Sequence, residues 1–580
     1  MANEYTAPTT DLLFNLKHLV DLEELSSREG FEEASPDMAE AILEEAGRFA
    51  SEVFAPINPT GDQQGNRLEG DEVSTAGGFA EAYGQFMENG WQALEAPVDF
   101  GGQGFPKAVG SCATEIWNSA NASLALCPLL TAGAIEALEQ HASDELKATY
   151  LEKLVSGEWT GTMNLTEPGA GSDLAAVRSK AIPEDDHYRI SGTKIFISWG
   201  EHGMTENIIH LVLARLPDAP EGTRGISLFL VPKFMVNDDG SLGERNDVKA
   251  TSLEHKLGIH GSPTCVMNFG DADGAIGYLI GEENKGLACM FTMMNAARLG
   301  VGVQGLAVGE RAYQGAVAYA RERVQAKTII EFPDVARMLL TMRALTEAGR
   351  GVALTAMAAF DRAANPKDEA EQAGQQARVD LLTPIVKGWL TENGQEITSL
   401  GVQVHGGMGY VEETGAAQHM RDARIFSIYE GTNGIQALDL VGRKTLKDGG
   451  AAMRTLLDDM RAVDVSGTDL AEDYATLLNQ ATEGLNWLLE QGAADRDIPA
   501  TVAFPYLMLM GTVCGGWVMA RQALAAQAEL DVGEGDPAFM NAKLKLARFY
   551  FDHIAPRADG YLRTVKAGTR GVTDWDREWF

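Results

Sequence analysis

The chain has 580 residues, 45% of them hydrophobic and 22% charged, as expected for a soluble globular protein of several structural units. Its formal net charge of -36 at pH 7 argues against nucleic acid and anionic membrane surfaces as partners. Five scattered cysteines without a CxxC pair argue against a disulfide framework and against a zinc site, and they favour a reducing cytoplasm.

The first 160 residues are predicted to be mainly helical. Asp37 with Glu40 is typical of a helix start, and an apolar stripe follows at helical spacing through Phe49. Further helices are expected over 76–90 and from 113 to 156, on either side of a glycine-rich loop. The N-terminus shows no basic region followed by an apolar core, so we expect no secretory signal.

Strand patterns begin near Trp159 and continue to Asp271. They are short runs rich in β-branched residues, separated by turn clusters with proline and aspartate. The predicted strands are 188–190, 194–199, 208–214, 226–231 and 265–269. Because no helix separates them, we expect a small barrel or sandwich.

Helical patterns return after Gly286, with helices expected over 303–324, 333–362, 368–402 and 433–448. Helices, then strands, then helices predict a mainly α fold with a central β-barrel-like domain. The predicted domains are 1–160 (helical), 161–285 (β), 286–450 (helical bundle) and 451–580 (helical extension).

One uncharged segment, from Ile498 to Ala520, is about long enough to cross a bilayer. It contains prolines and glycines and lies in a helical, acidic region. We therefore expect a buried helix pair rather than a membrane span.

The densest run of chemical groups extends from Arg421 to Gly434. Glu430 lies there between an aromatic residue and a glycine, beside apolar side chains, and Thr432 is a plausible N-cap for the next helix. A carboxylate desolvated at such a turn has a raised pKa and acts as a base near neutral pH. The plain alternative, an ordinary surface glutamate before a helix, is open on this stretch alone.

Two glycine-rich loops are further candidates for ligand contacts. Thr166–Asp173 offers hydroxyls and backbone amides, and Gln403–Tyr410 contains three glycines that permit close approach of the backbone to a ligand. Each is also compatible with a purely structural turn.

Taken together and in this order, TEPGAGSD, KIFIS, QVHGGMG and MRDARIFSIYEGTNGIQ resemble the acyl-CoA dehydrogenases, over roughly residues 30 to 445. The resemblance implies a helical domain, a β-domain and a helical bundle that bind FAD. It makes Glu430 the catalytic base, which takes the α-proton of an acyl thioester, and makes the Glu430 N–H a donor to the thioester carbonyl. Some branches carry the base directly before the arginine that matches Arg298, where this chain has Ala297.

The same resemblance assigns binding residues. The positions that match FAD contacts, some of them reaching a neighbouring subunit's flavin, are Leu165, Thr166, Phe196, Ser198, Arg323, Gln325, Gln403, Gly407, Thr432 and Gly434. Phe196 stands where tryptophan is frequent, and stacking on the flavin survives that change. The positions that match substrate contacts are Ser172, Arg298, Tyr429 and Gly431, with Arg298 expected near the phosphate-bearing end of CoA.

The C-terminal extension resembles a long bacterial branch that includes 3-(methylthio)propanoyl-CoA dehydrogenases of dimethylsulfoniopropionate breakdown. That thioester is one expected substrate, and a general short- to medium-chain acyl-CoA is the other. The resemblance further implies an electron-transfer flavoprotein as electron acceptor, a cytoplasmic homodimer and no metal. An acyl-CoA oxidase, which shares the fold, remains an alternative, and a binding-only protein is disfavoured because Glu430 is present.

Overall fold

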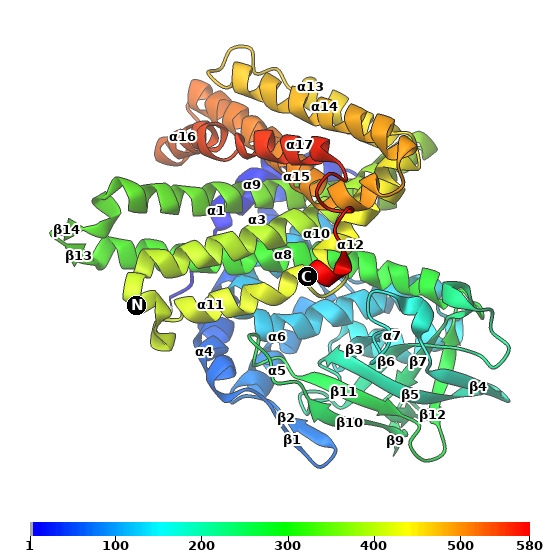
Figure 1. Cartoon of the computed structure of the whole chain (residues 1–580). Helices are drawn as coiled ribbons and strands as arrows, with labels where there is room; N and C mark the ends of the chain where they lie inside the picture. The colour runs from blue at the N-terminus through cyan, green and yellow to red at the C-terminus, as the bar shows by residue number, and fades with distance from the viewer. Residues whose placement is uncertain (1–3) are drawn as a thin grey trace. The chain divides into compact units, whose positions relative to one another are not determined.

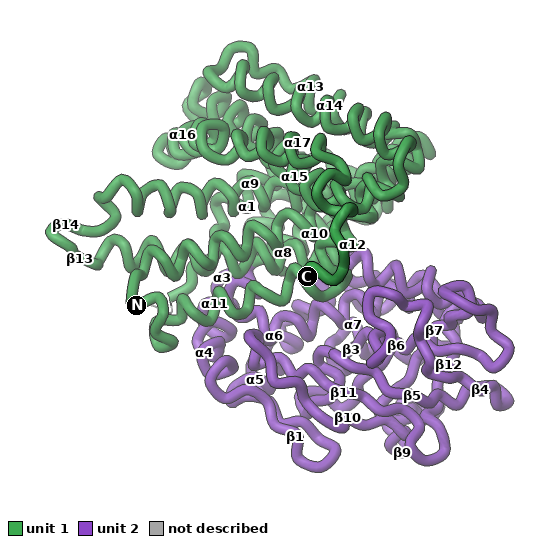
Figure 2. Tube along the Cα trace, viewed as in Figure 1, with its two compact units in different colours: residues 1–45, 106–115, 298–580 green, residues 46–105, 116–297 purple. Residues whose placement is uncertain are grey.

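The computed structural model describes residues 4–580, which form two compact units (Figure 2). Unit 1 consists of the chain up to Glu45 together with Pro106–Glu115 and Arg298–Phe580; unit 2 consists of Ala46–Phe105 and Ile116–Ala297. Unit 1 is mainly helical and unit 2 contains the large sheet (Figure 1). This confirms the predicted fold class.

Unit 2 is built on an eight-stranded sheet that curls into half a barrel. Its strand order is β10-β11-β5-β12-β7-β6-β3, β4 pairs with β5, and all pairings except β3 with β6 are antiparallel. The strand bounds are β3 Trp159–Asn164, β4 Lys180–Glu184, β5 His187–Ser198, β6 Asn207–Ala214, β7 Ser227–Pro232, β10 Val248–Leu253, β11 Thr264–Phe269 and β12 Ala275–Ile280.

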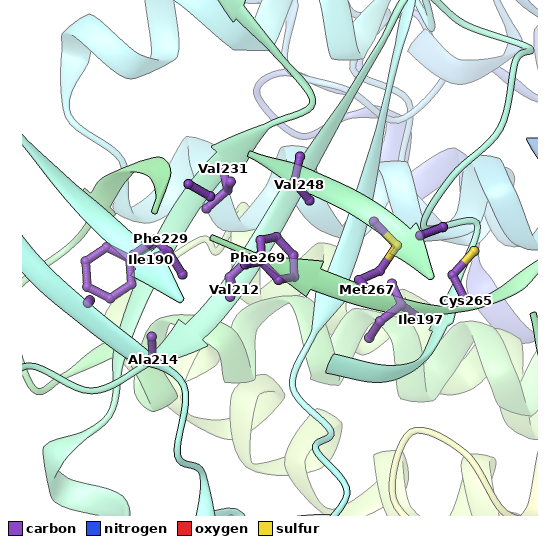
Figure 3. Close-up of a cluster of buried hydrophobic side chains, with 13 residues drawn as sticks. Ile190, Ile197, Val212, Ala214, Phe229, Val231, Val248, Cys265, Met267 and Phe269 are labelled. Atoms are coloured by element: carbon purple, nitrogen blue, oxygen red, sulfur yellow. The ribbon is translucent and has the colours of Figure 1, made fainter. Parts of the chain in front are cut away.

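The core of the sheet consists of side chains from seven strands that pack on one another, ten of which are labelled in Figure 3. Ile190, Val212, Phe229 and Val231 are fully buried there. Every residue of β6 is buried, including Asn207 and His210, which agrees with its otherwise apolar sequence. The two runs predicted around residues 190 and 197 belong to the single strand β5, whereas β3, β4, β10 and β12 were not among the predicted strands.

The remaining elements of unit 2 are short helices and hairpins. The helices are α4 Ala55–Gln64, α5 Phe79–Glu88 and α7 Asp144–Val155. Two small strand pairs of unit 2 were not predicted: β1 Arg67–Glu69 with β2 Glu72–Ser74, and β8 Phe234–Val236 with β9 Leu242–Arg245. A third unpredicted pair, β13 Val324–Gln325 with β14 Lys327–Thr328, lies in unit 1.

Long helices dominate unit 1. Helices α9 and α10 pack closely along each other and form its centre (Figure 1). The helix bounds are α1 Thr9–Asn15, α2 Leu22–Ser26, α9 Pro333–Ala364, α10 Glu369–His405, α11 Ala416–Ala423, α12 Asn433–Leu438, α13 Ala451–Arg461, α14 Ala471–Ala494, α15 Ile498–Val532, α16 Pro537–His553 and α17 Arg557–Ala567; α3 Pro36–Phe49, α6 Lys107–His141 and α8 Gly286–Glu322 run through both units. The helix expected over 433–448 is α12 followed by a π-helical segment, Asp439–Leu446.

By length and composition, three helices among the described residues are long and apolar enough to cross a membrane: α6, α8 and α15. Between 61% and 89% of each apolar stretch is buried inside the protein. The absence of a membrane span therefore stays a prediction. The uncharged segment after Ile498 forms one helix, α15, rather than the expected pair, because Pro505 lies inside the helix without ending it.

Helix α15 packs against α10, α12, α14, α16 and α17. The contact with α10 requires small residues, since a Cβ on Gly511 would lie 2.3 Å from Cγ of Trp389, and one on Gly388 would lie 2.7 Å from Leu507. Trp389 is almost fully buried. The extension is therefore fitted closely to the central helices of unit 1.

A buried ionic network also crosses unit 1. Arg350 on α9 donates to Glu115 Oε1 at 3.0 Å and to Glu310 Oε2 at 2.9 Å, and it also pairs with Asp11. Asp11 is shared with Lys543, which lies on α16 and pairs with Glu347 Oε2 at 2.7 Å. Burial alone would raise the pKa of Asp11, but Lys543 and Arg350 lower it to about 2.

We expect Gly511→Ala to destabilise the protein by roughly 1–3 kcal/mol, because the added methyl group overlaps the Trp389 ring. The matched control is Gly560→Ala on α17, where nothing lies within 4 Å and helix propensity predicts a neutral or slightly stabilising effect. Melting temperatures of the two variants measure the difference. Equal melting temperatures would show that the α10–α15 contact relaxes without cost.

Candidate functional site

Glu430 lies on a strained turn between η10 (Arg424–Ser427) and α12. Its φ of +56° is in the left-handed region, which costs a residue with a side chain about 1–2 kcal/mol. Gly431 follows with φ +87°, and a Cβ there would lie 2.8 Å from Nε2 of Gln436. The turn therefore requires glycine at 431 and holds Glu430 in an unfavourable conformation, which is typical of functional positions.

Two cations act on the Glu430 carboxyl group. Burial raises its pKa, and the charges of Arg298 and Lys387 partly oppose this, so that the pKa is about 7. A carboxylate with this pKa is half ionised at neutral pH and is suited to general-base catalysis. The predicted role of Glu430 as a base thus has a physical basis in unit 1.

Both ends of the turn are anchored. On one side the Tyr429 hydroxyl donates to Oε1 of Gln304, a fully buried residue of α8. On the other side Thr432 caps α12 by accepting from the Ile435 N–H at 3.3 Å, which confirms it as the N-cap. Burial raises the pKa of Tyr429 well above its usual value, so the phenol stays protonated beside the base.

The Glu430 N–H has no hydrogen-bond acceptor among residues 4–580, and neither has the Gly431 N–H. The Glu430 carbonyl, by contrast, accepts from Arg298 Nε at 3.4 Å. Backbone N–H groups left without a protein partner at a partly buried turn are suited to binding a substrate oxygen. This agrees with the donor role that the resemblance implies for Glu430.

Arg298 lies beside the Glu430 turn. It is 6% exposed, and its guanidinium contacts the backbone of the Glu430 turn. Burial lowers its pKa, and the charges of Asp439 and Glu430 oppose that change. Its charge therefore acts on Glu430, and its expected place near the phosphate-bearing end of CoA stays a prediction.

Sequence reasoning missed four residues that hold this turn: Gln304, Lys387, Asn433 and Gln436. Lys387 donates to Oδ1 of Asn433 at 2.9 Å, and Asn433 is the first residue of α12. A lone lysine in the apolar run Pro384–Leu390 was the available signal, because a charge at such a position needs a buried partner.

In unit 2 the loop after β3 is tied to β5. The Ile195 N–H donates to Thr166 O at 2.9 Å and Lys194 Nζ donates to Leu165 O at 3.1 Å. Lys194 also pairs with buried Glu167 at 2.7 Å. Four of the predicted FAD residues, two on the loop and two on β5, are thereby held close together.

Phe196 is presented to solvent by a β-bulge. Ile195 and Phe196 stand opposite the single residue Val266, because Lys194 pairs with Met267 and Ile197 with Cys265. Phe196 has φ +61° and is 59% exposed, which is unusual for a large aromatic side chain. An exposed ring beside a loop of backbone and hydroxyl groups fits the flat, polar-edged ring system of FAD.

The other predicted FAD residues lie in unit 1. Arg323 and Gln325 are exposed at the hairpin β13–β14, and Gln403 and Gly407 are exposed where α10 ends. The rings of Tyr319 and His405 stack at 4.5 Å, which brings these two segments together. Thr432 and Gly434 flank the start of α12, and Ser172 is exposed in its unit 2 loop. Their ligand contacts remain predictions.

Four family models match the chain in succession. They are described as the acyl-CoA dehydrogenase N-terminal domain (36–158), middle domain (162–272) and C-terminal domain (284–445), followed by an acetyl-CoA dehydrogenase C-terminal-like domain (450–576).

The chain is 49% identical to a 3-methylmercaptopropionyl-CoA dehydrogenase of Ruegeria pomeroyi, over 95% of this chain and 96% of that protein. It is 34% identical to a butyryl-CoA dehydrogenase of Syntrophomonas wolfei over the full length of both. The fold is also similar to a crystal structure of an acyl-CoA dehydrogenase from Bacillus anthracis complexed with FAD (TM-score 0.74, 22% identity, 91% of this chain and 88% of that one).

We expect Glu430→Gly to be more stable than Glu430→Ala by about 1 kcal/mol, because only glycine adopts φ +56° without strain. Both variants lack the carboxylate, so the comparison isolates the backbone conformation. Melting temperatures measure it. A Glu430→Ala protein as stable as Glu430→Gly would mean that the turn relaxes and carries no strain.

Proposed function

The chain belongs to the acyl-CoA dehydrogenase family, and we propose that its substrate is 3-(methylthio)propanoyl-CoA. The observation that carries this choice is the similarity to the Ruegeria pomeroyi enzyme, which extends over nearly the whole chain, including the C-terminal extension. The reaction is the FAD-dependent dehydrogenation of the bond between the α- and β-carbons, and the product is the trans-2-enoyl thioester.

Glu430 performs the proton transfer in this reaction. Its ionised carboxylate takes the proton from the α-carbon, which becomes acidic when the thioester carbonyl accepts a hydrogen bond from the Glu430 N–H. The pKa of about 7 is a compromise, because a lower value weakens the base and a higher one leaves it protonated at neutral pH. Tyr429 cannot compete for the proton, since its phenol is held protonated.

FAD supplies the acceptor for the hydride that leaves the β-carbon. In unit 2 the residues that would hold it are Leu165, Thr166, Phe196 and Ser198. The ion pair between Glu167 and Lys194 holds the loop after β3 against β5. The bulge in β5 turns Phe196 outward, where its ring can stack on an aromatic ring system.

A general short-chain acyl-CoA substrate is the second candidate. It is favoured by the full-length similarity to the Syntrophomonas wolfei butyryl-CoA dehydrogenase. The acyl chain of 3-(methylthio)propanoyl-CoA differs from that of butanoyl-CoA by one inserted sulfur atom. The binding free energies that a pocket gives to chains with such small apolar differences differ by only about 1–3 kcal/mol.

We further propose a cytoplasmic homodimer that passes electrons to an electron-transfer flavoprotein. Support for the dimer comes from four residues that match positions reaching a neighbouring subunit's flavin: Arg323, Gln325, Gln403 and Gly407. All four are exposed in unit 1. Glycine at 407 leaves the backbone open to close approach. Light scattering of the FAD-loaded protein tests the dimer, and a monomer would remove these cross-subunit roles.

The substrate proposal predicts that 3-(methylthio)propanoyl-CoA bleaches the flavin faster than butanoyl-, hexanoyl- or octanoyl-CoA in anaerobic single-turnover experiments. The rate constants of flavin reduction, compared at saturating substrate, decide the order. If butanoyl-CoA reduces the flavin as fast or faster, the protein is a general short-chain dehydrogenase. Rapid reoxidation of the reduced flavin by air would instead favour an oxidase.

Glu430→Gln should retain FAD and bind the acyl-CoA but lose flavin reduction by at least about a thousandfold, because the amide is nearly isosteric and cannot accept the α-proton. Flavin absorbance, titration with the thioester and stopped-flow reduction measure the three properties. Glu490→Gln, at an exposed position on α14, is the matched control and should behave as the wild type. Turnover of Glu430→Gln within tenfold of the wild type would place the base elsewhere.

A further inference from the structure

Lys387 is an unusual residue for its surroundings. It lies on α10 within residues 381–390, all of which are buried, and it is fully buried itself. An ammonium group in such an environment costs free energy unless hydrogen bonds or an opposite charge compensate for the lost water. Its Nζ donates to Oδ1 of Asn433 at 2.9 Å. Lys387 is therefore bonded to Asn433, which is the first residue of the helix after Glu430.

Asn433 is held from several directions by α10. The two N–H groups of its Nδ2 are shared among three acceptors: Gly388 O at 3.2 Å, Thr391 Oγ1 at 3.0 Å and Glu392 Oε1 at 2.7 Å. Together with the Lys387 bond, these contacts fix both ends of the amide group. Because Asn433 is three residues after Glu430, they fix the downstream end of the catalytic turn to α10.

The turn needs such an anchor. Glu430 and Gly431 both have positive φ values, and a backbone in this conformation persists only where the surrounding structure holds it. The Tyr429 hydroxyl holds the upstream end through Gln304. The hydrogen bond between Lys387 and Asn433 fixes the downstream end in the same way.

Lys387 also interacts with Glu430 through its charge. The charged groups that act on Lys387 are Glu430, Arg298 and Glu392, and those that act on Glu430 are Arg298 and Lys387. Burial lowers the pKa of Lys387 to about 7, and the charge of Glu430 opposes this. Each group therefore favours the charged form of the other.

We propose that Lys387 is a positioning residue for the dehydrogenation, which anchors the Glu430 turn to α10 through Asn433. The charge of Lys387 additionally favours the ionised form of the carboxylate. The proposal rests on Glu430 as the base of the proposed function. Arg298 provides the other charge from α8, so the base is influenced by cations on two different helices.

Three variants separate the two parts of this role. Lys387→Gln retains a hydrogen-bond donor toward Asn433 and loses the charge; Asn433→Ala keeps the charge and loses the anchor; Lys387→Met loses both. Lys545→Met, at an exposed position on α16, is the matched control for removing a lysine.

The decisive measurement is the pH dependence of flavin reduction by whichever acyl-CoA reduces the wild type fastest. In the wild type the rate should rise with pH to half its maximum near pH 7, where Glu430 ionises. Loss of the positive charge raises the pKa of Glu430, so in Lys387→Gln the midpoint should move up by as much as about one pH unit. Because the pKa of Lys387 is itself about 7, only part of the wild-type protein carries this charge at pH 7, so the rate there should fall by less than about fivefold, and the loss is recovered above pH 9.

Asn433→Ala should instead lose about tenfold or more in rate at every pH, without a comparable change in KM, because a misplaced base costs rate rather than binding. Lys387→Met should show both effects. Midpoints and maximal rates that stay at wild-type values in all three variants would overturn the proposal, as would a loss in Lys387→Gln that no pH recovers.

A second readout does not depend on turnover. Hydrogen–deuterium exchange of the backbone amides over 428–436 should accelerate at least about tenfold in Asn433→Ala and Lys387→Met, and remain at the wild-type rate in Lys545→Met. Unchanged exchange in both anchor variants would remove the positioning role. If no acyl-CoA reduces the wild-type flavin, the proposed function fails, and the exchange experiment still decides whether Lys387 holds the turn.

Discussion

The proposed site depends on one carboxylate, that of Glu430, which has to be desolvated and ionised at the same time. Removal of water strengthens Glu430 as a base, but it also favours the protonated form, which cannot act as one. The protein meets both requirements with nearby positive charge, from Arg298 on α8 and Lys387 on α10. These cations are themselves buried, so the cost of desolvation is distributed over three groups that stabilise one another.

The sequence was sufficient for the fold class, and it singled out Glu430, whose role as the base belongs to the proposed function. Long periodic helices such as α9 and α10 and the apolar strands β6 and β7 carry strong local patterns, and Glu430 lies in a specific motif. The supporting residues could not be predicted in the same way. Lys387 and Asn433 are 46 positions apart, and only the tertiary structure shows that they are bonded. Phe196 was matched by motif, whereas the bulge that exposes it depends on pairing with β11.

The extension belongs physically to the site-bearing unit. Helix α15 contacts both α10, which carries Lys387, and α12, which begins with Asn433. Glycines at 388 and 511 allow Leu507 and Trp389 to approach at van der Waals distance. Since packed interiors transmit small displacements, the close fit of α15 makes the catalytic turn less free to move. This gives the last 130 or so residues a structural role that does not require a separate ligand.

The pairing of Asp11 with Lys543 has a consequence for biosynthesis. The two residues are separated by 532 positions, so the central helices α9 and α10 are synthesised long before the second cation of Asp11 exists. Until Lys543 has been made, Asp11 and the α9 residue Glu347 lack one of their compensating charges. Complete closure of unit 1 therefore comes late in synthesis, after the apolar helices that it covers.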